Sequence, residues 1–271
     1  MATVTARLTF DGNLQVNTPV TGTIFNEISR STIGVDPSNF YAVEFDEVSM
    51  DPTFIASAKA QDATNSLTVV INKPLGTIDG DLMIAYVSGT SSAPTWTPPA
   101  GWTGINTNGG AWFGYKIAVS EGASYTFTCN TSATQSGFIL TFRNVSYDLA
   151  GTYSPAANPS VTPSITVTKD NSIEVVIAIT QAGGTGQTYT APAGFNQLDF
   201  DSDSTAPSWA VFSKLVNAGA TGTVSITGTN GALANQRSIQ LALSPNLVPM
   251  RYFPGGSVQI IGVLDETSTL T

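Results

Sequence analysis

Polar and apolar residues alternate along short stretches of this chain, and helical periodicity is almost absent. Runs rich in Val, Ile, Thr, Tyr and Phe recur between Gly, Pro and Asn residues, and a period of two residues is typical of half-buried β-strands. About ten such strands predict an all-β fold, namely an antiparallel β-sandwich or jelly roll. We expect the strands at Ser66–Ile71, Asp81–Val87, Ala111–Val119, Ser124–Cys129, Gly137–Phe142, Ser164–Thr168, Ser172–Ile179, Ser208–Leu215, Thr221–Thr227 and Ser238–Leu243.

The strand pattern occurs twice. Residues 95–102 read Thr-Trp-Thr-Pro-Pro-Ala-Gly-Trp, and residues 188–195 read Thr-Tyr-Thr-Ala-Pro-Ala-Gly-Phe, with related apolar strands before and after each copy. The repeat predicts a duplicated sandwich with halves at residues 58–146 and 147–245, each leaving an apolar face that the other covers. Two small sandwiches in tandem are the alternative.

The repeat also predicts core residues. Trp102 matches Phe195 and Trp112 matches Trp209, and aromatic side chains at matching positions of a duplicated fold are expected in its core. Cys129 is the single cysteine of the chain, so an intramolecular disulfide is excluded. Because Cys129 lies in a strand-like run, we expect a buried, unreactive thiol.

The two ends of the chain carry a weaker repeat. Gly12–Val16 resembles Gly256–Ile260, and Phe45–Ser49 resembles Leu264–Ser268, although chance similarity of common strand residues is an alternative. Segments this short cannot form a core, so they must pack on the sandwich, on each other or on another subunit. We therefore expect three parts: an N-terminal β module for attachment at 1–57, the duplicated sandwich at 58–245, and a C-terminal β arm at 246–271.

Composition narrows the set of partners. Hydrophobic residues make up 41% of the 271 residues, enough for a folded core, whereas charged residues make up only 11%. The net charge is −9, and the 10 Lys and Arg residues are scattered, so nucleic acid and anionic membrane surfaces are not expected partners. No run approaches the ~18 apolar residues of a membrane helix. The first residues lack the pattern of a signal peptide, so we expect cytoplasmic synthesis without one.

The sequence offers little for catalysis. It contains no histidine, which removes Ser-His-Asp and Cys-His triads and imidazole metal ligands. It also lacks the Gly-x-Ser-x-Gly elbow and the Gly-rich phosphate loops. We therefore expect a protein that is not an enzyme, with no catalytic residue and no cofactor-binding residue.

Two groups of residues are candidates for ligand binding. Asp199, Asp201 and Asp203 alternate along the chain and could supply oxygen ligands to calcium, although the EF-hand pattern fails because Ser204 and Ala210 replace its Gly and Glu. The alternative is a solvated acidic loop. Trp96 and Tyr189, each flanked by Thr, are expected to be partly exposed and could stack on a sugar ring. The alternative for this pair is packing within a turn.

Several of these motifs together resemble a known family. The run from Ile78 to Tyr86 contains Gly-Asp-Leu, and it is followed by Pro-Pro-Ala-Gly-Trp at 98–102, Tyr-Lys-Ile-Ala at 115–118, Phe-Arg-Asn-Val at 142–145 and a second Pro-Ala-Gly-aromatic turn. This combination resembles the duplicated β-sandwich of tail, fibre and head-decoration proteins of tailed bacteriophages, and of some bacterial surface proteins. The second half departs from it, because it lacks the Gly-Asp before its strand and the aromatic-Arg-x-Val near its end.

The resemblance implies a role in a virion or in surface display, and it supplies no catalytic residues. We expect a non-enzymatic structural protein of a bacteriophage particle, either a capsid decoration or head fibre, or a tail fibre or baseplate subunit. Its expected location is the virion, after synthesis in the host cytoplasm. Its expected partners are other virion proteins and copies of itself, with a trimer as the working hypothesis. The alternative function is a carbohydrate-binding host-recognition module, or adhesin, that binds a host surface glycan through loops such as 88–97 and 181–190.

Overall fold

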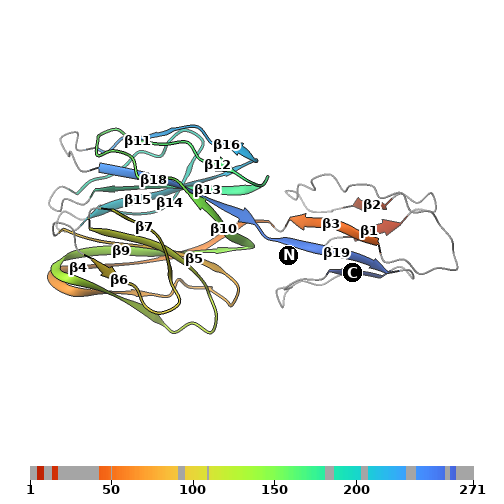
Figure 1. Cartoon of the computed structure of the whole chain (residues 1–271), viewed down its shortest axis with the longest axis horizontal. Coiled ribbons are helices and arrows are strands. Elements are labelled where there is room, and N and C mark those ends of the chain that lie inside the picture. Colours follow the sequence, from red (N-terminus) through yellow and green to blue (C-terminus); the bar gives the residue numbers. More distant parts are fainter. Residues whose placement is uncertain are drawn as a thin grey trace. The chain divides into compact units, whose positions relative to one another are not determined.

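The computed structural model describes residues 5–8, 14–17, 43–49, 51–90, 95–108, 110–180, 186–202, 207–229, 236–253 and 257–260. These residues form β-strands and no helix, so the predicted all-β class is confirmed. The chain divides into two compact units (Figure 1). One unit comprises Met1–Asp51 together with Asn246–Thr271, and the other comprises Pro52–Pro245.

The larger unit contains two main antiparallel sheets, which Figure 1 shows as two layers. The first sheet has the order β4-β9-β5-β8-β7, with β6 paired to β9. Its strands are β4 (Thr53–Asn72), β5 (Leu82–Gly89), β6 (Trp96–Thr97), β7 (Thr103–Asn108), β8 (Ala111–Ile117) and β9 (Ser124–Arg143).

The second sheet has the order β10-β18-β13-β15-β14. Two short pairs, β11 with β17 and β12 with β16, lie outside that order. The strands are β10 (Val145–Ala150), β11 (Ser160–Thr162), β12 (Thr166–Val167), β13 (Ser172–Thr180), β14 (Asn196–Asp201), β15 (Ser208–Val216), β16 (Gly219–Ala220), β17 (Val224–Ile226) and β18 (Gln236–Pro245).

The two sheets have the same strand order when each is followed along the chain. The central strand of the first sheet, β5, pairs with β8 and β9, just as β13 pairs with β15 and β18 in the second. Leu82 lies opposite Ile117 and Phe142, and Ile173 lies opposite Leu215 and Leu243. The shared order agrees with the sequence repeat, while duplication of the halves stays a prediction.

The main core lies between the two sheets and is built by both halves. Alternate residues of each central strand point into it, because successive side chains of a strand face opposite sides. Each apolar face removes the other from water, which stabilises the fold by roughly 25 cal/mol per Å² of apolar surface buried. The buried members are Leu82, Ile84, Tyr86, Ala111, Phe113, Phe138, Leu140, Phe142, Val145, Tyr153, Ile173, Val175, Ile177, Ile179, Trp209, Val211, Ile239, Leu241 and Leu243.

Each sheet also buries part of its outer face. In the first half β4 and β9 are long, and their distal parts pair with each other from Ser66 to Asn72 while Val69, Ile71 and Phe127 pack on the sheet. In the second half the shorter strands β11 and β17 take this place, and Val224 and Ile226 pack on Val176 and Phe212. A third, smaller cluster of Ile165, Val167 and Ala242 also packs in the second half, so the described residues form one central core and three further clusters.

The smaller unit joins the two ends of the chain. Here β1 (Thr5–Leu8) pairs with β2 (Leu14–Asn17), and β3 (Val43–Ser49) pairs with β19 (Leu247–Phe253), which also pairs with β20 (Ser257–Ile260). An N-terminal strand and two C-terminal strands thus form one three-stranded sheet in the order β20-β19-β3. The expected boundary between residues 57 and 58 lies inside β4, and the motif at Leu264–Ser268 lies outside the described residues.

Candidate functional site

The acidic candidates lie on an edge strand of the second sheet. Asp199 and Asp201 belong to β14, and Asp203 lies outside the described residues. Asp199 Oδ1 lies 3.3 Å from Nζ of Lys59, and the same ammonium donates a hydrogen bond of 2.6 Å to the Phe200 carbonyl. Lys59 is on β4, so this contact joins the edges of the two sheets. The described residues contain no group of three acidic, Cys or His side chains placed to hold a metal.

The two candidates for sugar stacking are buried, so the expectation that they are partly exposed is wrong. Trp96 is 7% exposed and Tyr189 is 8% exposed. The Trp96 indole donates a 2.9 Å hydrogen bond to the Gly110 carbonyl, and the Tyr189 hydroxyl lies 2.7 Å from Oγ1 of Thr180. Both rings belong to the outer clusters of their sheets. Each side chain therefore packs against its own sheet and offers no exposed face for a sugar ring.

Trp102 and Phe195 occupy matching places, whereas Trp112 and Trp209 do not. Trp102 belongs to the outer cluster of the first sheet and Phe195 to that of the second. Trp112 also lies in the first outer cluster, but Trp209 lies in the central core. All four are buried as predicted, yet the expected match of Trp112 with Trp209 is wrong.

The register explains this difference. Lys116 lies opposite Met83, and Lys214 lies opposite Glu174, so the two lysines are equivalent. Trp112 precedes its lysine by four residues and Trp209 precedes its lysine by five. An odd shift moves a side chain to the other face of a strand.

An ion pair joins two motifs of the family resemblance. Asp81, from Gly-Asp-Leu, accepts hydrogen bonds from Arg143 at 2.9 Å to Oδ1 and 3.1 Å to Oδ2. Arg143 comes from Phe-Arg-Asn-Val and also donates to the Gly76 carbonyl at 3.0 Å. The register places Ser172 and Ser244 at the equivalent positions of the second sheet. The charged residues of the two motifs are thus partners, and the second half lacks both.

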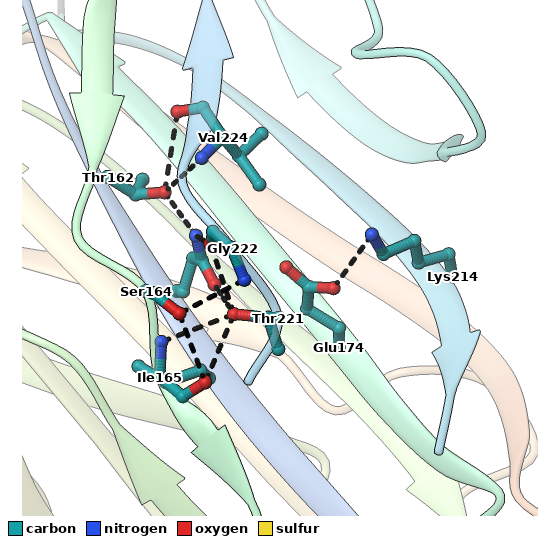
Figure 2. A network of polar contacts seen from close by, with 9 residues as sticks. Thr162, Ser164, Ile165, Glu174, Lys214, Thr221, Gly222 and Val224 are labelled. Carbon is teal, nitrogen blue, oxygen red and sulfur yellow. Dashed lines mark hydrogen bonds and ion pairs between the residues drawn. The ribbon is translucent and has the colours of Figure 1, made fainter. Parts of the chain in front are cut away.

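Each half uses its equivalent lysine differently. Lys116 lies 2.7 Å from Oε1 of Glu121, whose Oε2 accepts a 2.9 Å hydrogen bond from the Tyr125 hydroxyl. Lys214 forms an ion pair with Glu174, marked in Figure 2, in which its Nζ lies 3.1 Å from Oε2. Glu174 occupies the position of Met83 in the first half, so the second half has a carboxylate where the first has an apolar side chain.

Glu174 is the one fully buried carboxylate side chain among the ion pairs of the described residues. Its Oε1 has no hydrogen-bond partner among them. Burial raises the pKa of Glu174, and Lys214 counters part of that rise. Lys214 also lies 4.4 Å from the centre of the Phe195 ring, which is a cation–π distance. Burial of Glu174 therefore carries a desolvation cost that Lys214 only partly offsets.

A buried polar network lies beside this pair (Figure 2). The Gln240 side chain donates to Oγ1 of Thr162 and, at 3.1 Å, to the Gly222 carbonyl, and its Oε1 accepts from Thr221 at 2.8 Å. The Thr162 hydroxyl in turn accepts a 3.1 Å bond from the Val224 amide. These contacts tie β11 and the residues after β16 to the outer face of β18, so they hold the outer layer to the sheet.

Cys129 is buried, with 1% of its surface exposed, in agreement with the sequence prediction. Cys129 lies opposite Trp96 in the pairing of β6 with β9. The thiol belongs to the apolar outer cluster of the first sheet.

Comparisons with known proteins add no assignment. No protein-family model matches the chain, and no curated protein and no solved structure matches it. In the described part of the chain no helix is long and apolar enough to cross a membrane.

Proposed function

We propose that this protein is a non-enzymatic structural protein of a bacteriophage particle, attached by its terminal unit and displaying the β-sandwich. The supporting observation is the pairing of β3 with β19, which joins an N-terminal and a C-terminal segment in one sheet. The sandwich, in contrast, closes its own core with residues of both halves. Attachment and display are therefore separate parts of the chain.

The backbone of the terminal unit suits attachment. Among its described strands, β3 and β20 are the outer strands of the three-stranded sheet. An outer strand presents backbone N–H and C=O groups that can pair with a strand of another chain. Such pairing repeated around a symmetry axis favours a homo-oligomer, and we propose a trimer. A capsid decoration or head fibre and a tail fibre or baseplate subunit remain equal versions of the proposal.

The arrangement of the strands in the sandwich supports the display role. The chain enters β4 beside Arg143 and leaves β18 beside Val145, at the end of the sheets that contains Leu82 and Ile173. The connections after β5 and β13 lie at the opposite end, beyond Ser88 and Thr180. The alternative function, a carbohydrate-binding host-recognition module, would use these connections; buried Trp96 and Tyr189 give it no stacking surface.

Labelling of purified particles tests the proposal. An antibody raised against residues 52–245, coupled to gold, is applied to phage particles from a culture that produces the protein. We expect regular labelling at one location, on the head or on the tail. Particles from a culture with the gene deleted are the control. Labelling equal to that control, with the protein found only in the soluble fraction of the lysate, would refute a virion role.

A further inference from the structure

A group of polar side chains lies between the two sheets at the loop end of the sandwich. On β5, Ser88 follows the core residues Ile84 and Tyr86 at the next alternate position. On β18, Arg237 precedes the core residues Ile239 and Leu241 in the same way. Since alternate residues share a face, Ser88 and Arg237 point toward the same space as the central core. The apolar core thus ends in polar groups at this end.

The two sheets meet here. The Trp209 indole of the second sheet donates a 2.8 Å hydrogen bond to Oγ of Ser136 in the first, and its ring centre lies 4.4 Å from that of Phe138. Burial raises the pKa of Tyr153, while the positive charge of Arg237 opposes that rise. Arg237 is therefore close enough to Tyr153 to act on it electrostatically.

Three groups at this place lack partners. Tyr86 and Ser88 are 0% exposed, and Tyr86 Oη, Ser88 Oγ and Nε of Arg237 are buried without a hydrogen-bond partner among the described residues. Ser88 lies beside Tyr86 and counters part of the rise in its pKa, yet the two hydroxyls are not in hydrogen-bonding geometry. Arg237 also makes no ion pair with any described residue. A buried donor without a partner destabilises the free protein, so a ligand that accepts its hydrogen bond is favoured at this position.

We propose that Arg237, Tyr86 and Ser88 form a binding site for a carboxylate group, such as that of an acidic sugar. The three side chains supply a guanidinium and two hydroxyl donors, which suits a planar acceptor with one negative charge. A phosphate dianion is less suitable, because Arg237 is the one cation among the three side chains. The whole chain carries net charge −9 and repels anions, so an Arg without an ion-pair partner among the described residues singles out the site. The inference goes beyond particle attachment and does not depend on it.

Isothermal titration calorimetry on the full chain tests the site with glucuronate, glucose and inorganic phosphate as probes. We expect glucuronate to bind at least about tenfold more tightly than glucose or phosphate, and Arg237→Gln to weaken glucuronate binding by about tenfold or more. Arg251→Gln makes the same charge change on β19 in the other unit and should leave binding unchanged. Absence of glucuronate binding, phosphate binding of equal strength, or unchanged binding by Arg237→Gln would overturn the proposal.

Tyr86→Phe separates a binding role from a structural role and also covers the case in which Arg237→Gln does not fold. The substitution removes an unpaired buried hydroxyl, so the free protein should keep or raise its Tm while glucuronate binds several-fold more weakly. Ser88→Ala should act in the same direction. A lower Tm with unchanged glucuronate affinity would show that the hydroxyl serves the fold alone, and would contradict the site.

Discussion

Trp209→Phe tests whether the two halves unfold as one unit. Trp209 belongs to the second half and is fully buried against Phe138 of the first, with its indole hydrogen-bonded to Ser136. The substitution leaves the Ser136 hydroxyl without its donor, which costs about 1–3 kcal/mol, and opens a cavity smaller than that of Trp→Ala, for which the cost is about 3–5 kcal/mol. We therefore expect a loss of roughly 2–3 kcal/mol in the free energy of unfolding.

The assay uses the positions of the other tryptophans. The chain has 4 Trp residues, and after the substitution the remaining three, Trp96, Trp102 and Trp112, all lie in the first half. Their fluorescence reports unfolding of that half, while circular dichroism reports both halves. If the central core couples the halves, the urea midpoint measured by fluorescence falls together with the midpoint measured by circular dichroism. A fluorescence midpoint equal to that of the wild type, with a separate lower transition by circular dichroism, would refute a shared cooperative unit.

Two substitutions at the ion pairs are expected to act in opposite directions. Asp81→Ser should lower the free energy of unfolding in urea by about 1–3 kcal/mol, because the Arg143 guanidinium loses the Asp81 carboxylate. The double variant Asp81→Ser/Arg143→Ser copies the serines of the second half and should cost less than the sum of the two single variants. Additive costs would exclude coupling between the two residues. Glu174→Gln should stabilise the protein at neutral pH, because the folded state of the wild type must ionise a buried carboxyl whose pKa is raised. The difference should vanish below the ordinary Glu pKa of about 4.3 and grow as pH rises through the raised pKa of the folded state, so a constant difference across pH would contradict the assigned cause.

The sequence predicts the elements better than the faces on which their side chains lie. Alternation and the two Pro-Ala-Gly turns identify the strands, and Gly101 and Gly194 adopt matching positive φ values of 87° and 80°. The placement of Trp209 depends on a one-residue difference in strand position, which similarity of composition does not reveal. The burial of Trp96 and Tyr189 likewise depends on layers formed by distant segments.

The sequence pattern also does not predict which distant segments pair with each other. Pairing of β3 with β19 joins segments from opposite ends of the chain, and nothing local specifies it. The sequence does indicate that Glu174 needs a partner, because it is a carboxylate within the apolar run Ser-Ile-Glu-Val-Val-Ile. The identity of the partner follows only from the strand register, which places Lys214 opposite Glu174. The same holds for Arg237 and Tyr86, which belong to different sheets and face one core only when the sheets pack.

Co-sedimentation of a truncated chain with particles that lack the protein tests attachment through the terminal unit. A chain ending at Pro245 loses β19 and β20 but keeps the whole sandwich and all four tryptophans. We expect it to remain folded by circular dichroism and Trp fluorescence, to be monomeric, and to stay in the supernatant, while the full chain and its Glu174→Gln variant sediment with the particles. A truncated chain that is folded and binds particles as well as the full chain would contradict the account.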